Sequence, residues 1–212
     1  MRRLPVYLLL DTSYSMAGEP LTAVEQGVDL LLSTLRRDPY ALETAHLSVI
    51  TFDEQARQIA PLTELPLFQA PSLKAQGTTA LGAALTLLAQ CIRTEVATTT
   101  PQTKGDWKPL IFIMTDGVPT DDWRAGQAAL SQVRTGVVVA CAAGRDADTS
   151  ILRELTDAVV QLDTADAERI AAFFKWISAS ISTGSQKVDL TKKDLSQLGD
   201  LPPPPPEVNI VL

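Results

Sequence analysis

The chain has 212 residues, of which 45% are apolar and 20% charged, with a formal net charge of −7. This composition predicts a packed core and excludes a wholly disordered chain. The acidic balance argues against non-specific binding to nucleic acid or to anionic membranes, which both need basic patches. No stretch approaches the roughly 18 apolar residues of a membrane span. We therefore expect one substantial domain, with or without a tail, and neither nucleic acid nor a membrane as a partner.

The first informative stretch is VYLLLDTSYS, from Val6 to Ser15. Its continuous apolar run is typical of a strand buried on both faces of a parallel sheet. Asp11, Ser13 and Ser15 follow at alternate positions, at the strand end where open α/β sheets place their ligands. Carboxylate and hydroxyl oxygens are hard donors, which suit Mg²⁺, Mn²⁺ or Ca²⁺.

Three elements are predicted next along the chain. Apolar residues at helical spacing predict a helix over Leu21–Arg37, ended by Pro39. The stretch HLSVITF, His46–Phe52, predicts a second strand. Residues Gln58–Leu62 predict a short antiparallel hairpin arm, which Pro61 confines to an edge of the sheet.

The stretch QGTTALGAAL predicts a tight turn before a helix over Ala80–Ala97. Thr78 and Thr79 lie at the start of that helix, and two interpretations stay open. Threonine is a good helix cap. Alternatively, Gly77 and Gly82 allow close backbone approach, which would place a threonine beside the ligand-binding edge of the sheet.

LIFIMT, Leu110–Thr115, is another continuous apolar run, and Asp116 follows it. A single aspartate at a strand end is commonly a turn or cap residue, whereas two such aspartates, one of them inside DTSYS, favour a site. Asp121 and Asp122 are interpreted as start residues of a helix over Trp123–Val133, with a secondary role at the rim of the site left open.

Two further strands and two further helices complete the expected fold. The strands are predicted over Gly136–Ala142 and Ala158–Leu162, and the helices over Ser150–Thr156 and Asp166–Ser182. This alternation predicts a doubly wound, mainly parallel six-stranded sheet with helices on both faces and the hairpin arm as its one antiparallel edge strand.

The composition changes after Gly184, which predicts a domain over residues 1–184 and a proline-rich tail over residues 185–212. Pro202–Pro206 are five consecutive prolines, which favour an extended polyproline II conformation. Glu207–Leu212 are apolar again. The tail is interpreted as solvated, and the alternative is that it docks onto the domain or a partner.

The reactive side chains outside these motifs have ordinary interpretations. Cys91 and Cys141 lack metal-ligand spacing and are predicted to be buried free thiols in a reducing compartment, which implies a cytoplasmic protein. His46 is the only histidine. It is interpreted as a strand or surface residue because no serine or cysteine motif accompanies it.

DTSYS after an apolar strand, GTTALGAAL opening a helix, and LIFIMTDG together resemble the von Willebrand factor A domain and its metal-ion-dependent adhesion site. The resemblance covers about Pro5 to Thr183. It implies a Rossmann-like fold and a divalent cation, Mg²⁺ first and Mn²⁺ or Ca²⁺ as alternatives, with these ligands: Asp11, Ser13, Ser15, Thr79 and Asp116. Thr79 matches because Gly82 follows it by three residues, while Thr78 stands where the family has a glycine and is the other candidate.

In that family the sixth metal position is left for water or for an acidic side chain of a partner. The resemblance therefore implies a metal-dependent protein-interaction module without catalytic residues. LPVYLLLDTSYSMAGEP and LIFIMTDGVPTDDW are similar to a bacterial tellurite-resistance subgroup. Its stress-response operons include a kinase and a phosphatase, either of which is an expected partner.

The alternative function is a Mg²⁺-dependent phosphohydrolase of the haloacid-dehalogenase type, which also has an aspartate after its first strand. Those enzymes need a D-x-D motif whose second aspartate serves as acid and base, and that position here is Ser13. A dinucleotide-binding function is less favoured still, since no G-x-G-x-x-G follows the first strand.

Overall fold

The computed structural model describes residues 2–144, 147–191 and 193–211. The strands are β1 (Leu4–Asp11), β2 (Ala45–Phe52), β3 (Ala56–Glu64), β4 (Leu110–Thr115), β5 (Val138–Ala143), β6 (Ala158–Leu162) and β7 (Asn209–Val211). The α-helices are α1 (Glu19–Leu35), α2 (Pro39–Thr44), α3 (Leu81–Glu95), α4 (Trp123–Ser131), α5 (Thr149–Leu155) and α6 (Ala167–Thr191). Two short 3₁₀ helices, Tyr14–Met16 and Leu198–Asp200, complete the described elements.

The strands form one sheet in the order β3-β2-β1-β4-β5-β6-β7. Strands β1, β2, β4, β5 and β6 run parallel, whereas β3 and β7 pair antiparallel at the two edges. The predicted doubly wound, mainly parallel α/β fold is confirmed. Strand β1 lies inside the sheet between β2 and β4, and all eight of its residues are buried, which explains the apolar run that precedes Asp11.

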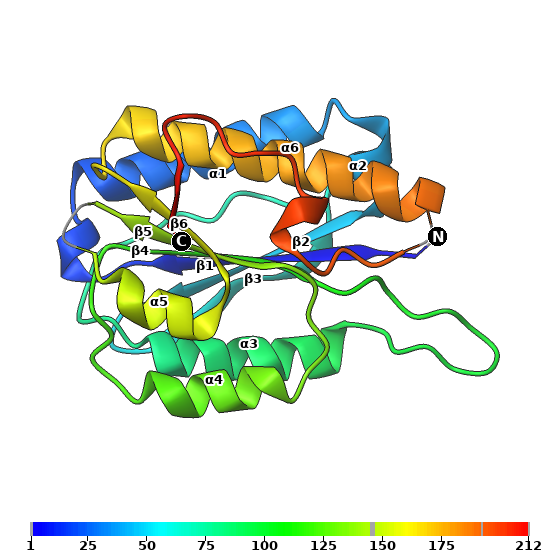
Figure 1. The fold of residues 1–212 in the computed structure, drawn as a ribbon, viewed down its shortest axis with the longest axis horizontal. Helices are drawn as coiled ribbons and strands as arrows, with labels where there is room; N and C mark the ends of the chain where they lie inside the picture. Colours follow the sequence, from blue (N-terminus) through cyan, green and yellow to red (C-terminus); the bar gives the residue numbers. More distant parts are fainter. Residues whose placement is uncertain (1, 145–146, 192, 212) are drawn as a thin grey trace.

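Helices cover both faces of the sheet. Figure 1 shows α1, α2 and α6 on one face and α3, α4 and α5 on the other. Alternate residues of β1 enter two separate apolar clusters, because successive side chains of a strand point to opposite faces. Leu8 packs in the cluster beneath α1 and α6, and Leu9 packs in the cluster above α3.

The sheet has seven strands in the described residues instead of the expected six, because the end of the tail is a strand. Strand β7 pairs with β6, which would otherwise present an open edge. Before it, the tail runs along α6 (Figure 1), and the Trp176 indole Nε1–H donates to the carbonyl oxygen of Pro202 at 2.8 Å. The solvated interpretation is therefore wrong and the docking alternative holds. Helix α6 also continues past Gly184, so the expected boundary there lies within a helix.

Other local expectations have definite outcomes. Pro39 does not only stop α1, since it also begins α2, where the Asp38 carboxylate accepts from Tyr40 N at 2.9 Å. Both cysteines are buried and free, as predicted. His46 lies near the start of β2, where its Nδ1 is 3.2 Å from the Thr44 carbonyl oxygen. None of the helices in the described ranges combines the length and apolar character needed to cross a membrane.

Candidate metal centre

The candidate site lies where the strand order reverses. Strands β1 and β4 are parallel neighbours at the middle of the sheet, although about 100 residues separate them. Asp11 is the last residue of β1 and Asp116 follows directly after β4. Both carboxylates therefore lie at the carboxyl ends of the parallel strands, at the kind of topological switch point where open α/β sheets bind ligands.

A continuous series of hydrogen bonds joins four of the predicted site residues. The amide N–H of Ser13 donates to Asp11 Oδ1 at 2.8 Å. Ser13 Oγ and Ser15 Oγ lie 2.9 Å apart, and Ser15 Oγ donates to Asp116 Oδ1 at 2.7 Å. Asp11 and Ser13 are buried whereas Ser15 is exposed. The series thus runs from the interior of the sheet to the molecular surface.

Thr79 lies at the same place, beside the residue that follows Asp116. It is only 5% exposed, and a methyl group added at Gly117 would lie 3.2 Å from Thr79 Oγ1. The hydroxyl therefore faces the backbone directly after Asp116. Thr78, the other threonine left open by the sequence, is exposed.

Two backbone hydrogen bonds hold the loop before α3 against the end of β1. Gln76 N donates to the carbonyl oxygen of Thr12 at 2.8 Å, and Tyr14 N donates to that of Gly77 at 3.1 Å. Gly77 has φ +65°, a left-handed conformation that favours glycine. The three segments that carry the predicted ligands are thus linked to one another.

Thr115 is a contributor that sequence reasoning missed. Its hydroxyl donates to Asp11 Oδ2 at 2.5 Å, and this bond links the ends of β1 and β4. The available signal was a hydroxyl residue at the end of an otherwise apolar run. Because both Asp11 oxygens accept hydrogen bonds, the carboxylate has a fixed orientation.

Asp53, at the end of β2, was also missed, and its partners explain its burial. Its Oδ2 lies 2.7 Å from Arg57 Nη1 and accepts from Gln76 Nε2 at 3.0 Å. Burial alone would raise the pKa of Asp53, but hydrogen bonds from Gln55 N–H, Arg57 and Gln76 hold it below its ordinary value. With its charge already matched by Arg57, Asp53 supports the Thr79 loop.

The prediction for Asp121 and Asp122 is half right. Asp122 caps α4, because its side chain accepts from Ala125 N. Asp121 caps α3 instead, with its two carboxylate oxygens accepting from Gly82 N at 2.9 Å and Ala83 N at 2.8 Å. The reason is that α3 and α4 lie against each other, so a residue before one helix reaches the start of the other.

The electrostatics of the centre favour a cation. Burial raises the pKa of Asp11 to about 6, although the hydrogen bonds from Thr115 and Ser13 act in the opposite direction. Burial likewise raises the pKa of Asp116. Two carboxylates that are both costly to ionise stand at one point, and a bound positive charge would relieve that cost.

The donor set fits a hard divalent cation. Adjacent ligands of an octahedral Mg²⁺ site, at about 2.1 Å from the metal, lie roughly 3 Å from one another. The oxygens of Ser13, Ser15 and Asp116 are spaced at 2.9 and 2.7 Å. Within residues 2–144, 147–191 and 193–211, no group of three His, Cys, Asp or Glu side chains could hold a metal. A cation at this centre must therefore accept hydroxyl oxygens as ligands.

The von Willebrand factor type A domain model matches residues 6–171. The chain therefore belongs to the von Willebrand factor type A domain family, whose members often mediate protein interactions. No curated protein matches the chain significantly.

Solved structures share the fold at low identity. A von Willebrand factor type A protein from Catenulispora acidiphila is 18% identical with a TM-score of 0.64, over 86% of this chain and 43% of that one. The pilus adhesin SpaC from Lactobacillus rhamnosus GG is 15% identical with a TM-score of 0.66, over 86% of this chain and 30% of that one. The PilB minor pilin from Streptococcus sanguinis is 12% identical with a TM-score of 0.63, over 85% of this chain and 61% of that one. The chain thus spans less than two thirds of each of these proteins.

Proposed function

We propose that this protein is a metal-dependent protein-interaction module. Its centre would hold a divalent cation, Mg²⁺ first and Mn²⁺ or Ca²⁺ as alternatives, through these side chains: Asp11, Ser13, Ser15, Thr79 and Asp116. The observation that supports this most is the oxygen series Ser13–Ser15–Asp116 at the carboxyl edge of the sheet. The cation supplies a Lewis-acidic position that an incoming oxygen ligand can occupy.

The chemistry of the centre indicates what a partner must offer. Three of the five proposed ligands are neutral hydroxyl groups and two are carboxylates, so the protein's own ligands would neutralise a divalent cation without leaving a negative charge that repels a further anion. An acidic side chain of a partner is then a favourable further ligand. Tyr14 and Val118, which are 69% and 54% exposed, flank the serines and Asp116 in sequence. They provide apolar contact area for the partner around the acidic group.

The resemblance to the tellurite-resistance protein TerY supports a narrower proposal. The module would act in the bacterial cytoplasm, in a stress-response phosphorylation system, and the acidic side chain would come from a kinase or phosphatase of the same operon. The support for it is the similarity of the two stretches LPVYLLLDTSYSMAGEP and LIFIMTDGVPTDDW to that subgroup.

The side chains of the centre favour binding over catalysis. A phosphohydrolase of the haloacid-dehalogenase type needs a second aspartate as its acid and base, and Ser13 occupies that position. Ser13 and Ser15 contact only each other and the aspartates through their hydroxyl groups in the described structure. Neither has a general base of the kind that activates a nucleophilic serine.

Calorimetric titration of Mg²⁺, Mn²⁺ and Ca²⁺ tests the metal site. We expect binding heat in the wild type and its loss in Asp11→Ala and Thr79→Ala, while Asp157→Ala, which removes an exposed carboxylate elsewhere, serves as the control. Pull-downs of the operon kinase and phosphatase with and without metal then test the interaction. Equal heats in the wild type and Asp11→Ala would overturn the site assignment.

A phosphatase assay on p-nitrophenyl phosphate with Mg²⁺ separates the two functions. We expect no turnover. Turnover that disappears in Asp11→Asn would favour the enzyme instead.

A further inference from the structure

A pocket of about 280 Å³ lies at the end of the sheet opposite the metal centre. It is bounded by the end of α3, by the residues before β4, and by the connection from α4 to β5. The metal centre follows the other end of β4. Six residues of β4 at about 3.3 Å each separate the two ends by roughly 20 Å. A ligand in this pocket therefore cannot touch the metal centre.

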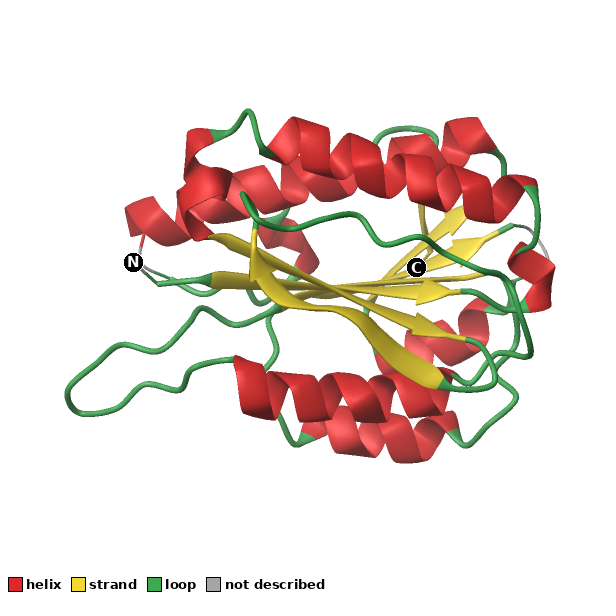
Figure 2. Ribbon diagram, turned by 180° about the vertical axis from the view of Figure 1, so that it is seen from behind, coloured by secondary structure: helices red, strands yellow, loops and turns green. Residues whose placement is uncertain are grey.

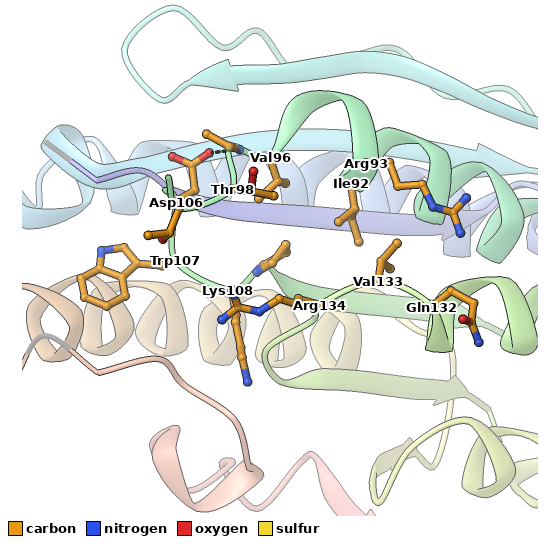
Figure 3. Close-up of a pocket in the computed structure, with 13 residues that line it drawn as sticks. Ile92, Arg93, Val96, Thr98, Asp106, Trp107, Lys108, Gln132, Val133 and Arg134 are labelled. Carbon is orange, nitrogen blue, oxygen red and sulfur yellow. Dashed lines mark hydrogen bonds between the residues drawn. The ribbon is translucent and has the colours of Figure 1, made fainter. Parts of the chain in front are cut away.

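The walls of the pocket are apolar. Figure 3 shows Ile92 and Val96 of the α3 end on one side of the pocket and Val133 on the other. Pro109 contributes further apolar surface. Such walls suit an apolar side chain or ring, since each apolar group removed from water here contributes to binding.

The charged side chains around the pocket are mainly basic. Arg93, Lys108 and Arg134 all line it, in a chain whose net charge is −7. Within the described ranges Lys108 and Arg93 form no ion pair, and Arg134 has only a loose one, 3.8 Å from Asp194, with its own side chain 73% exposed. These positive charges are available to an incoming anion.

The one carboxylate that lines the pocket is already occupied. Asp106 Oδ1 accepts from Arg3 Nε at 3.0 Å, and its Oδ2 accepts from Ala97 N at 2.8 Å. Its side chain is only 6% exposed. It therefore does not cancel the basic character of the pocket opening.

A projecting loop extends the surface beyond the pocket. Residues 96–109, which we call the arm, reach past the end of α3 in Figures 1 and 2. The base of the arm is pinned, because Asp106 N donates to the Ala97 carbonyl oxygen at 2.9 Å. Arg2 also holds it, with Nε donating to Gly105 O at 2.6 Å and its guanidinium 3.4 Å from the Trp107 ring centre. Because the pinned base of the arm lies beside the pocket, an extended peptide segment can contact both, and this favours a protein partner.

We propose that the pocket and the arm form a second docking surface, which binds an acidic protein segment with an apolar anchor side chain. The anchor enters between Ile92 and Val133, and flanking carboxylates pair with Lys108, Arg134 and Arg93. Binding at this surface needs no metal. The module then contacts two partners at opposite ends of one sheet.

The test uses ¹⁵N-labelled full-length protein in EDTA, titrated with the peptide acetyl-EEFEE-amide. We expect saturable shifts of amides from the pocket and the arm. The peptide acetyl-QQFQQ-amide removes the negative charges and acetyl-EEAEE-amide removes the anchor, and both should bind more weakly. No saturable shift with millimolar acetyl-EEFEE-amide, or equal binding of the glutamine peptide, overturns the proposal.

Two variants locate the charges. Lys108→Gln combined with Arg134→Gln should weaken binding by roughly three- to tenfold, as expected for two partly exposed ion pairs. Arg37→Gln removes an exposed charge of the same sign from the end of α1 and should leave binding unchanged. Unperturbed amide spectra outside the pocket show that each variant is folded. Equal weakening in both variants, or shifts that require Mg²⁺, would place the peptide elsewhere and overturn the assignment.

Discussion

The hydroxyl of Thr115 donates to the carboxylate of Asp11 at 2.5 Å, across the junction of β1 and β4. This bond joins the two strands at the point where both strand-end aspartates stand. It also fixes the orientation of a carboxylate whose other oxygen already accepts from Ser13 N. Thr115 is thus a positioning residue for the proposed metal ligand.

Removing the Thr115 hydroxyl should weaken metal binding without unfolding the protein. Partners that orient metal ligands typically contribute 10- to 100-fold in affinity, so we expect about a tenfold or greater loss of Mg²⁺ affinity in Thr115→Val. Thr115→Ser keeps a hydroxyl and should retain most of the affinity. Calorimetry on both variants checks this, and equal affinities in the two would show that the hydroxyl has no positioning role.

The buried carboxylate of Asp11 should destabilise the metal-free protein near neutral pH. Its pKa of about 6 lies above the ordinary value of 3.8, so the folded state binds a proton more tightly than the unfolded state. Stability from this group is therefore present at acidic pH and is lost as the pH rises through about 4 to 6, by up to about 3 kcal/mol.

Urea unfolding in EDTA checks this effect. Asp11→Asn replaces the carboxylate with an uncharged amide of the same shape. The variant should therefore have a higher free energy of unfolding than the wild type at pH 7.5, and the difference should shrink towards pH 4. Adding Mg²⁺ should stabilise only the wild type. A variant less stable than the wild type at pH 7.5 in EDTA would contradict the prediction.

The close contact between α3 and α4 should not tolerate a side chain at Gly82. An added methyl group would lie 2.5 Å from the Asp122 carbonyl oxygen. We expect Gly82→Ala to lower the free energy of unfolding by about 1–3 kcal/mol, as measured by urea unfolding. Gly199→Ala has open space around it and should change stability by less than about 0.5 kcal/mol. Similar stabilities of the two variants would mean that the helices can separate at little cost.

Removal of β7 should promote self-association. Truncation before Glu207 would leave the edge of β6 without its antiparallel partner, and an open strand edge pairs readily with another chain. We expect the mean mass in light scattering to rise with concentration more steeply than for the full chain. Ile210→Thr keeps the strand and should behave as the full chain does. A truncated protein that matches the full chain would show that other parts of β6 protect its edge.

The sequence predicts best those elements whose side chains are nearly all buried. Strands β4 and β6 have their predicted bounds, because each is a short, mainly apolar stretch whose side chains are mostly buried. Asp11, Ser13, Ser15 and Asp116 come together because the carboxyl ends of the parallel strands β1 and β4 lie side by side. Thr79 could be selected only through its spacing from a glycine.

Features that depend on contacts between distant segments were not predictable in the same way. Strand β7 has only three residues, and its existence depends on the free edge of β6. Asp121 caps α3 because of how two helices approach each other, which no local pattern records. The extra length of α6 runs through a stretch of changed composition.

The position of β1 between β2 and β4 has a consequence for how the protein is made. Strand β1 finds β2 early, but its other neighbour, β4, begins 58 residues after β2 ends, at residue 110 against residue 52. At about 5–20 residues per second, a ribosome needs roughly 3–12 s for that interval. The nascent chain therefore presents one unpaired side of this apolar strand for seconds. Asp11 and Asp116 can meet only after β4 emerges, so the ability to bind a cation arises late in synthesis.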